Sequence, residues 1–434
     1  MNTSPYPTYR PSGVEWLGDV PKHWKVRRLH YVCRFAYGDS LPSEAREDGE
    51  TPVFGSNGPV GTHDEPNTSA PVIVVGRKGS HGEVNYSKDA VFAIDTTYFV
   101  DGRYTDSALR WVYYALLCAD LGDVSKDSAV PGLSREDAYG KRLPLPPLDE
   151  QRAIAVFLDR ETERIDALVA KKRQLIERLQ EYRIALITRT VTRGLPPDAA
   201  RAAGLAPSPR LKPSGVEWLG DVPEHWEVKR LKWSSPRSIN GVWGDEPDGE
   251  NDMVCVRVAD FDRRQFRVIL DDPTERAITG AQRSGRELEV GDLLLEKSGG
   301  GEKQMVGCVV HYDHDEAAVC SNFIARLAVA PRQHPLFWTY AHAALYAGKL
   351  NYPAIKQTTG IQNLDSGAYF DTPVAFPPQA EQVAIASFLD QETGAVDNLT
   401  SRVEAAMERL QEHRTALITA AVTGKVDVRT RPPT

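Results

Sequence analysis

The sequence predicts an α+β chain in which two globular domains are separated by two long helices. The helices are expected to form an antiparallel coiled coil about a pseudo-twofold internal repeat. Three observations predict this fold: a 19-residue segment occurs twice, a longer segment with helical apolar spacing occurs twice, and the stretches between them show no obvious similarity. A repeat of about 200 residues is too long for a solenoid and indicates two tandem units.

The first repeated segment, which we call the lead-in, precedes each variable region. It reads PSGVEWLGDVPKHWKVRRL over residues 11–29 and PSGVEWLGDVPEHWEVKRL over residues 213–231, so that 16 of 19 positions are identical. The second repeated segment covers residues 150–192 and returns over residues 381–423, with 24 of 43 positions identical. The order is therefore lead-in, variable region and long helix, and then the same again. A common frame carries two different inserts.

These repeats set the domain boundaries that we expect. We predict a first domain with its lead-in at 1–148, a first long helix at 149–193, a linker at 194–212, a second domain with its lead-in at 213–378, a second long helix at 379–423 and a C-terminal tail at 424–434. The linker is rich in Pro, Ala and Gly, as connecting segments commonly are. In the first domain, strand composition over 71–76 and 90–100 and helical composition over 107–121 predict strands with one helix.

Apolar residues in the two long helices recur at alternating steps of three and four, which is a heptad pattern. Each helix follows a Pro-Pro pair, and a long helix with one narrow apolar stripe needs a partner. The other copy is the nearest candidate, although two core helices of an ordinary domain would also fit. The predicted seam residues are Ile165, Leu168, Leu175, Leu179 and Leu186 in the first helix and Val396, Leu399, Val403, Leu410 and Leu417 in the second.

The composition of the 434 residues limits the class of protein. With 26% charged and 41% hydrophobic residues, the chain is long and apolar enough for several packed domains. A formal net charge of -8 excludes a protein that coats nucleic acid through bulk charge, but it allows a local basic face. Five cysteines have no CxxC spacing, and no apolar run is long enough to span a bilayer. We expect a soluble, cytoplasmic protein with reduced thiols and no membrane partner.

Glycine-rich loops in the variable domains are candidates for DNA contacts. The segment GRKGSHG at 76–82 places glycine at every third position. In the second domain, GDLLLEKSGGGEKQMVG at 291–307 and KQTTGIQNLD at 356–365 supply similar groups. Glycine permits close backbone approach, while basic and amide side chains reach phosphates and base edges. A solvated hairpin loop is the alternative interpretation of the glycine-rich segment. The predicted DNA-contact residues are Arg77, Lys78, Ser80, His81, Lys297, Ser298, Lys303, Gln357, Thr359 and Asn363.

Sequence motifs for catalysis are missing. There is no GxxxxGK[ST] phosphate loop, no Asn-Pro-Pro-aromatic tetrapeptide of the kind that amino-methyltransferases use, and no evident triad or carboxylate pair. His311 and His314 could suggest a metal site, but two histidines in an acidic turn are more often surface residues. We therefore predict a non-catalytic binding protein that holds no cofactor and no metal.

On these residues the chain resembles the specificity subunit of type I restriction–modification systems. The resemblance rests on the doubled PSGVEWLGDVPxHWxV lead-in, on PPLDEQRAIAVFLD at the start of the helix, and on the loops FGSNGPVG, GRKGSHG, EKSGGG and TTGIQNLD. It covers essentially the whole chain. It implies a DNA-binding subunit whose variable regions are target recognition domains, each for one half of a bipartite, asymmetric site. It further implies that the two helices set the distance between the half-sites.

The resemblance also implies the partners of the chain. They are double-stranded DNA, two modification subunits that methylate adenine with S-adenosylmethionine and dock on the helices, and restriction subunits that use ATP and Mg²⁺. None of these cofactors is expected on this chain. Three alternatives stay open: a subunit of a methylation-only or other phage-defence complex, a single-chain enzyme with an unrecognised nuclease or methyltransferase site, and a coiled-coil scaffold without a DNA role.

Overall fold

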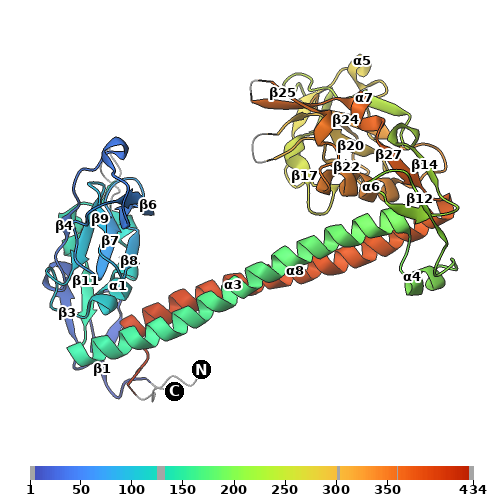
Figure 1. The fold of residues 1–434 in the computed structure, drawn as a ribbon. Helices are drawn as coiled ribbons and strands as arrows, with labels where there is room; N and C mark the ends of the chain where they lie inside the picture. The colour runs from blue at the N-terminus through green and yellow to red at the C-terminus, as the bar shows by residue number, and fades with distance from the viewer. Residues whose placement is uncertain (1–4, 125–131, 301–303, 359, 430–434) are drawn as a thin grey trace. The chain divides into compact units, whose positions relative to one another are not determined.

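The computed structural model describes residues 5–124, 132–300, 304–358 and 360–429, and it divides into two compact units (Figure 1). Unit 1 comprises Met1–Lys172 and Ala405–Thr434, and unit 2 comprises Arg173–Glu404. Each unit therefore contains one globular domain with its lead-in and a part of both long helices. The mixture of helices and sheets, with two domains and two long helices, confirms the predicted fold class.

The long helices are α3 (Leu148–Arg193) and α8 (Gln379–Val422), and each begins directly after its Pro-Pro pair. In unit 1, Asp166 of α3 forms an ion pair with Arg414 of α8 at 2.9 Å. In unit 2, Arg183 of α3 pairs with Asp397 of α8 at 3.3 Å. The residue number on α8 falls as the number on α3 rises, so the helices are antiparallel. The two ion pairs are equivalent in the internal repeat, because positions 166 and 183 correspond to positions 397 and 414.

Burial along the helices corrects part of the predicted seam. The predicted seam residues that are buried are Ile165, Val396, Val403 and Leu417, and those that are half-buried are Leu179, Leu186 and Leu410. The exposed ones are Leu168, Leu175 and Leu399, at 41%, 41% and 44%, and their assignment to the seam was wrong. The positions that turn inward lie one residue later in each case and are Val169, Ile176 and Thr400.

The reason for the error is an ambiguity between neighbours. Leu168 precedes Val169 and Leu175 precedes Ile176, so either member of each pair satisfies an apolar heptad position. In α8, the buried hydroxyl of Thr400 donates a hydrogen bond to the carbonyl oxygen of Val396 at 2.9 Å. A threonine whose polar group is satisfied by its own helix can occupy a buried position that its composition alone would not suggest.

The first domain packs a helix and two sheets around a central strand. The first sheet has the order β4 (Ala36–Tyr37), β10 (Thr97–Asp101), β7 (Val72–Gly76) and β8 (Val84–Ser87), and the second has the order β6 (Gly58–His63), β5 (Thr51–Gly55) and β9 (Phe92–Ala93). The helices are α1 (Leu109–Leu117) and α2 (Arg135–Gly140). Ile73 of β7 belongs to the same core cluster as Trp111 of α1, while Val74 packs in the cluster of Phe54 from β5. The central strand is thus buried on both faces.

The segment 90–100, predicted as one strand, forms the two strands β9 and β10. A tight turn separates them, in which the Thr97 amide donates to the Ile94 carbonyl oxygen at 2.9 Å. The turn sends β9 to pair with β5 and β10 to pair with β7. The predicted helix at 107–121 is shorter and corresponds to α1.

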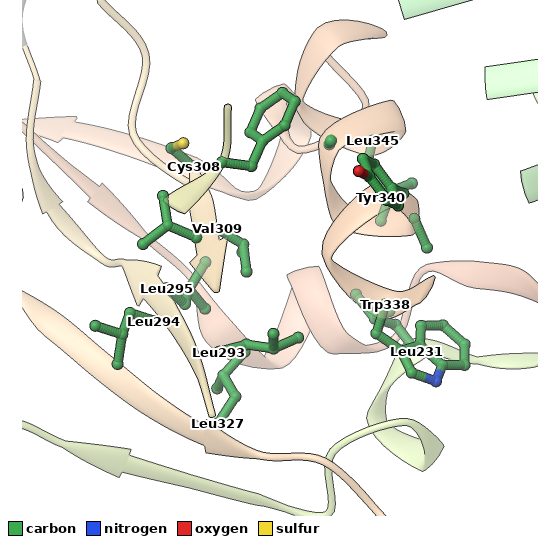
Figure 2. Packing of buried hydrophobic residues seen from close by; sticks show 14 of the residues in the cluster. Leu231, Leu293, Leu294, Leu295, Cys308, Val309, Leu327, Trp338, Tyr340 and Leu345 are labelled. Atoms are coloured by element: carbon green, nitrogen blue, oxygen red, sulfur yellow. The ribbon is translucent and has the colours of Figure 1, made fainter. Parts of the chain in front are cut away.

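The second domain is built on a larger sheet. Its order is β15 (Arg237–Asn240), β24 (Ile324–Ala328), β20 (Leu293–Glu296), β22 (Val309–His311), β18 (Arg267–Val268) and β17 (Phe261–Asp262). Two three-stranded sheets accompany it, β19 (Glu275–Ala277) with β16 (Asp252–Val256) and β23 (Ala318–Cys320), and β21 (Ser298–Gly299) with β26 (Ile361–Leu364) and β25 (Ile355–Thr358). The helices of this domain are α5 (Gly280–Arg283), α6 (Pro335–Ala347) and α7 (Ser366–Phe370). Figure 2 shows Leu293 and Val309 of the large sheet facing Trp338 and Tyr340 of α6 across the core.

The two lead-ins form the same small ribbons. In unit 1 the ribbons are β1 (Tyr9–Pro11) with β2 (Asp19–Pro21) and β3 (Lys25–Arg28) with β11 (Arg142–Leu145). In unit 2 they are β12 (Leu211–Pro213) with β13 (Asp221–Pro223) and β14 (Glu227–Arg230) with β27 (Pro373–Phe376). The linker contains one short helix, α4 (Pro197–Ala202). Within the described part of the chain, no helix combines the length and apolar character that crossing a bilayer requires.

Candidate DNA-binding interface

A buried glutamate in the first turn of α3 fastens the first lead-in to the helix. Glu150 accepts hydrogen bonds from the Trp24 indole at 2.9 Å and from the Tyr6 hydroxyl at 3.1 Å. Its other carboxylate oxygen lies 2.7 Å from Nε2 of His23. Only 6% of the Glu150 side chain is exposed, so these groups satisfy a carboxylate that water barely reaches. The position at a helix N-terminus also suits a negative charge.

The second copy repeats this fastening. Glu381 of α8 accepts a hydrogen bond from the Trp226 indole at 2.8 Å and lies 2.6 Å from Nε2 of His225. The lead-in and the helix start are therefore repeated together because they form one structural piece.

The glutamine that follows each glutamate holds the inserted domain. The Gln151 amide donates to the Pro146 carbonyl oxygen at 2.9 Å, and its own oxygen accepts from the backbone amide of Ala108, just before α1, at 2.8 Å. Gln382 accepts from the backbone amide of His334, just before α6, at 2.9 Å. One side chain of the frame thus caps the main helix of each domain.

A threonine further along each long helix makes a matching contact. The Tyr114 hydroxyl of α1 lies 3.2 Å from the Thr162 hydroxyl of α3, and it donates to Asp159 at 2.7 Å. In unit 2, the Tyr340 hydroxyl of α6 lies 3.2 Å from the Thr393 hydroxyl of α8. Because the frame holds both inserts in the same way, differences between the units arise in the parts of the domains away from the helices.

In the first domain, the four predicted DNA-contact residues lie on one loop between β7 and β8. The loop closes on itself, since the Gly82 amide donates to the Gly76 carbonyl oxygen at 2.8 Å. A Cβ atom at Gly76 would collide with the carbonyl oxygens of Ser80 and Ser56. The glycine therefore lets this loop and the β5–β6 turn approach each other.

The side chains of this loop differ in their freedom. Lys78 and Ser80 are exposed. His81 is half-buried, with its ring nitrogens 3.1 Å and 3.2 Å from the carbonyl oxygens of Gly79 and Gly122. His81 thus helps to shape the loop, while Lys78 and Ser80 remain available to a ligand.

Arg77 lies beside an exposed tyrosine that the sequence analysis missed. Its guanidinium donates to the Asp95 carbonyl oxygen at 3.0 Å and lies 5.0 Å from the ring centroid of Tyr37 and 5.9 Å from that of Tyr98. Arg135, the first residue of α2, lies 4.9 Å from the Tyr37 ring as well. Cation–π contacts of this kind hold a guanidinium in place without neutralising it. We call Arg77, Tyr37 and Arg135 the Tyr37 cluster.

In the second domain, three predicted contact residues meet on the sheet of β21, β26 and β25. Ser298 pairs with Asn363 across two strands, and its hydroxyl donates to the Asn363 side-chain oxygen at 2.6 Å. Gln357 is exposed and pairs with Gln362 across the other two strands. The structure therefore brings together residues that are about 60 positions apart in the sequence, because strand pairing joins two loops.

The remaining predicted residues of this domain have different outcomes. Lys297 is half-buried, its ammonium donates to the Asn240 side-chain oxygen at 2.5 Å, and burial lowers its pKa. It is thus engaged within the domain. Lys303 and Thr359 lie outside the described residues.

A buried ion pair positions the loop that follows β20, and the sequence analysis missed it. Glu296 is fully buried, and its two oxygens accept hydrogen bonds from Arg263 at 2.8 Å and 3.0 Å. Tyr346 of α6 donates to the Met305 carbonyl oxygen at 2.9 Å on the other side of the loop. Arg263 lies in a polar surface segment whose composition carries no sign of a buried partner.

The histidines considered for a metal site do not converge on a common point. His311 is buried, and burial lowers its pKa, while Nε2 of His314 lies 2.9 Å from the Val268 carbonyl oxygen. Across the described ranges, no group of three or more His, Cys, Asp or Glu side chains is arranged to hold a metal ion.

Comparison with known proteins agrees with the resemblance seen in the sequence. The family model for the type I restriction modification DNA specificity domain matches residues 21–178, which extend from the first lead-in into α3. No match was found among the curated proteins.

One solved structure shares the fold at low sequence identity, and two others match with lower TM-scores. A chain from a study of complex assembly and conformational transition of the type I restriction–modification system is 16% identical, with a TM-score of 0.62 over 94% of this chain and 99% of the other. The type I S subunit from M. genitalium is 15% identical, with a TM-score of 0.40 over 92% and 96%. The HsdS subunit from Thermoanaerobacter tengcongensis is 16% identical, with a TM-score of 0.45 over 94% and 98%. Residues 21–178 therefore match the family of type I restriction–modification DNA specificity domains, and this match confirms the resemblance that the sequence analysis found.

Proposed function

We propose that this chain is the DNA-recognition subunit of a type I restriction–modification complex and has no catalytic activity of its own. The observation that carries the proposal is that one frame, fastened by the same contacts in both units, holds two unlike domains. Such an arrangement suits two different half-sites, since mismatches at well-separated base pairs cost about 1–3 kcal/mol each and add. Each domain then recognises one half of a bipartite, asymmetric site, and α3 and α8 set the distance between the halves.

The chemistry of the candidate residues supports contacts to DNA. In the first domain, Arg77 offers two donors that match guanine or phosphate, and Lys78 and Ser80 are exposed on the same loop. In the second domain, Gln357 and Asn363 carry the amides that can bond base edges. The other proposed contact residues are His81, Lys297, Ser298, Lys303 and Thr359.

The repeated frame supports two copies of one partner. The two units share the helix start and the fastening contacts, so this part of the frame presents the same surface twice, as docking of two modification subunits requires. Those subunits would supply S-adenosylmethionine and the pocket for a flipped adenine, and restriction subunits would supply ATP-dependent cleavage.

The proposal is tested by single-molecule methylation sequencing of the source strain with and without the gene. We expect one bipartite, asymmetric adenine-methylation motif to disappear with the gene. An unchanged methylome, in a strain where the neighbouring modification gene is expressed and its product active, would refute the proposal.

Arg77→Ala tests the assignment of a half-site to the first domain. Loss of a bidentate contact to guanine should relax one position in one half-site by about 1–3 kcal/mol and leave the other half-site unchanged. A uniform decrease in affinity for all sequences would mean instead that Arg77 contacts only phosphate. Gln357→Ala, at an exposed residue, is the matched variant in the second domain and should affect only the other half-site.

A further inference from the structure

The two ribbons that join each lead-in to the end of its domain have the same fold but different charge. We call β3 with β11 the first ribbon and β14 with β27 the second ribbon, and we include the residue that follows β2 or β13 and the one that precedes β11 or β27. The charged positions of the first ribbon are Lys22, Lys25, Arg27, Arg28, Lys141 and Arg142, and the equivalent positions of the second are Glu224, Glu227, Lys229, Arg230, Thr372 and Pro373. Six positive charges on the first ribbon thus correspond to two positive and two negative charges on the second.

This contrast stands out against the near identity of the lead-ins. Their nineteen positions differ at only three, and two of the three reverse the charge. These are Lys22 against Glu224 and Lys25 against Glu227. The backbone is the same in both copies, so the fold does not require either charge.

The charges of the second ribbon are neutralised locally. Lys229 forms an ion pair with Glu227, and Arg230 forms one with Asp371 at 3.1 Å. Position 371 corresponds to Gly140 in unit 1, so the first ribbon lacks this acid. Five of its six cations are exposed and Lys141 is half-buried. None of the six forms an ion pair with an acid in the part of the chain that the structure describes.

One pair of these cations is placed unfavourably for the protein alone. Arg28 and Arg142 lie directly opposite each other in the β3–β11 ladder. Side chains at opposite positions share one face of the ribbon, and like charges there destabilise the pairing. A bound anion between the two guanidinium groups would remove the repulsion, and a phosphate accepts hydrogen bonds from both.

Helix α2 links the first ribbon to the Tyr37 cluster. Arg135 is the first residue of α2, while Lys141 and Arg142 follow its last residue, and α2 packs on the turn after β3. Six helical residues span about 9 Å, the axial length of about three phosphates of one DNA strand. The two acids of α2 are Glu136 and Asp137, of which Asp137 is bonded to Ser134 at the N-cap. Basic residues therefore lie at both ends of α2, with Arg135 at the end near the proposed base-contacting loop and Lys141 and Arg142 at the end near the ribbon.

We infer that the first ribbon binds the phosphate backbone of DNA beside the half-site of the first domain, and that the second ribbon does not bind DNA. This inference rests on the proposed function, because it assumes that the first domain lies on DNA. Two copies of one partner protein would need equal surfaces on the two units, and these surfaces differ by six charges. DNA is the partner that the two domains contact differently.

The test measures how duplex binding by the full chain depends on salt. Binding of a fluorescein-labelled duplex of arbitrary sequence is followed by anisotropy between about 50 and 200 mM salt, and log Kobs is plotted against log salt. The double variant Lys22→Glu with Lys25→Glu carries the residues of the second lead-in, which fold in the same ribbon. Its slope should be shallower than that of the wild type by about 2, since each lost phosphate contact removes about 0.9.

Two further variants separate the possible causes. Arg201→Glu with Arg210→Glu changes the net charge equally on exposed linker residues and should leave the slope unchanged. An equal decrease in this variant would mean that bulk charge is responsible and would overturn the inference. Arg28→Gln with Arg142→Gln should reduce the slope while thermal stability stays the same or rises, whereas a merely structural role would lower stability.

The remaining outcomes distinguish this inference from the proposed function. If the wild type binds the duplex and the Lys22→Glu, Lys25→Glu variant keeps its slope, the first ribbon does not contact DNA and only this inference fails. The same holds if that variant keeps its slope but no longer co-purifies with the neighbouring gene products, because the ribbon then docks protein. If the wild type binds no duplex, alone or with those products, the proposed function fails as well.

Discussion

Replacing the glutamate of each fastening by alanine should destabilise the two units unequally. In unit 1, Glu150→Ala leaves the buried Trp24 indole and Tyr6 hydroxyl without an acceptor and removes the contact with His23. An unsatisfied buried donor costs about 1–3 kcal/mol, so we expect a loss of about 3–5 kcal/mol in the stability of the lead-in. Glu381 has two such partners and is 17% exposed rather than 6%, so Glu381→Ala should cost about 2 kcal/mol.

Hydrogen exchange measured on lead-in peptides is the appropriate assay, because it reports the opening of each unit separately. Every 1.4 kcal/mol is a factor of ten, so Glu150→Ala should lower protection around Trp24 by about 10²- to 4 × 10³-fold. Glu381→Ala should lower protection around Trp226 by about thirtyfold. The control Glu150→Gln keeps one acceptor oxygen and should have about half the effect in free energy. Equal losses in both copies, or no loss at Trp24, would refute the reasoning from burial and partner number.

Three further predictions follow from the same structure. Val403→Ala should lower the free energy of unfolding by about 1–2 kcal/mol and Leu399→Ala by less than about 0.5, because Val403 is 6% exposed and Leu399 is 44% exposed. If urea denaturation ranks the two variants in the reverse order, Leu399 belongs to the seam as the sequence analysis predicted. Arg183→Ala should cost about 2 kcal/mol, because it removes a buried guanidinium and leaves the half-buried Asp397 carboxylate unpaired. The equivalent Arg414→Ala, whose side chain is 29% exposed, should cost at most about 1, as urea midpoints of both variants would show. Complete burial lowers the pKa of His342 from 6.5 to about 3. Below about pH 6.5, protons therefore bind preferentially to the unfolded state, and the free energy of unfolding should fall by about 2 kcal/mol by pH 5. His342→Gln should flatten that part of the curve, and an unchanged pH dependence in the variant would mean that other groups cause it.

The architecture could be predicted because two segments of the sequence are repeated. Two segments that recur at long range define a frame, and the Pro-Pro pairs mark the starts of α3 and α8 to within a residue. The residues in the seam between the two helices were harder to predict. The adjacent residues Leu168 and Val169 are both apolar, and only packing decides which of them faces the other helix.

Only part of the candidate site could be predicted from the sequence, because local patterns do not show which remote segments pair. Regularly spaced glycines mark the loop with Arg77 in the sequence. Gly76 is needed there because the backbone of Ser56 and Ser80 lies too close for a Cβ atom. No comparable sequence pattern surrounds Tyr37 or Arg135. They reach Arg77 only because β4 pairs with β10 and because α2 follows a distant loop, and pairing between remote segments leaves no local pattern.

The fastening contacts explain how one frame can hold two unrelated domains. Gln151 and Gln382 bond backbone amides, at an alanine in one domain and a histidine in the other, and a backbone amide is present whatever the residue. The contacts of the frame with domain side chains include one tyrosine hydroxyl in each unit, on the main helix of the domain. These shared contacts place few demands on the sequence of an insert. The surfaces that differ between the units, such as the first and second ribbons, are therefore free to change charge without loss of the fold, as the inference that only the first ribbon binds DNA requires.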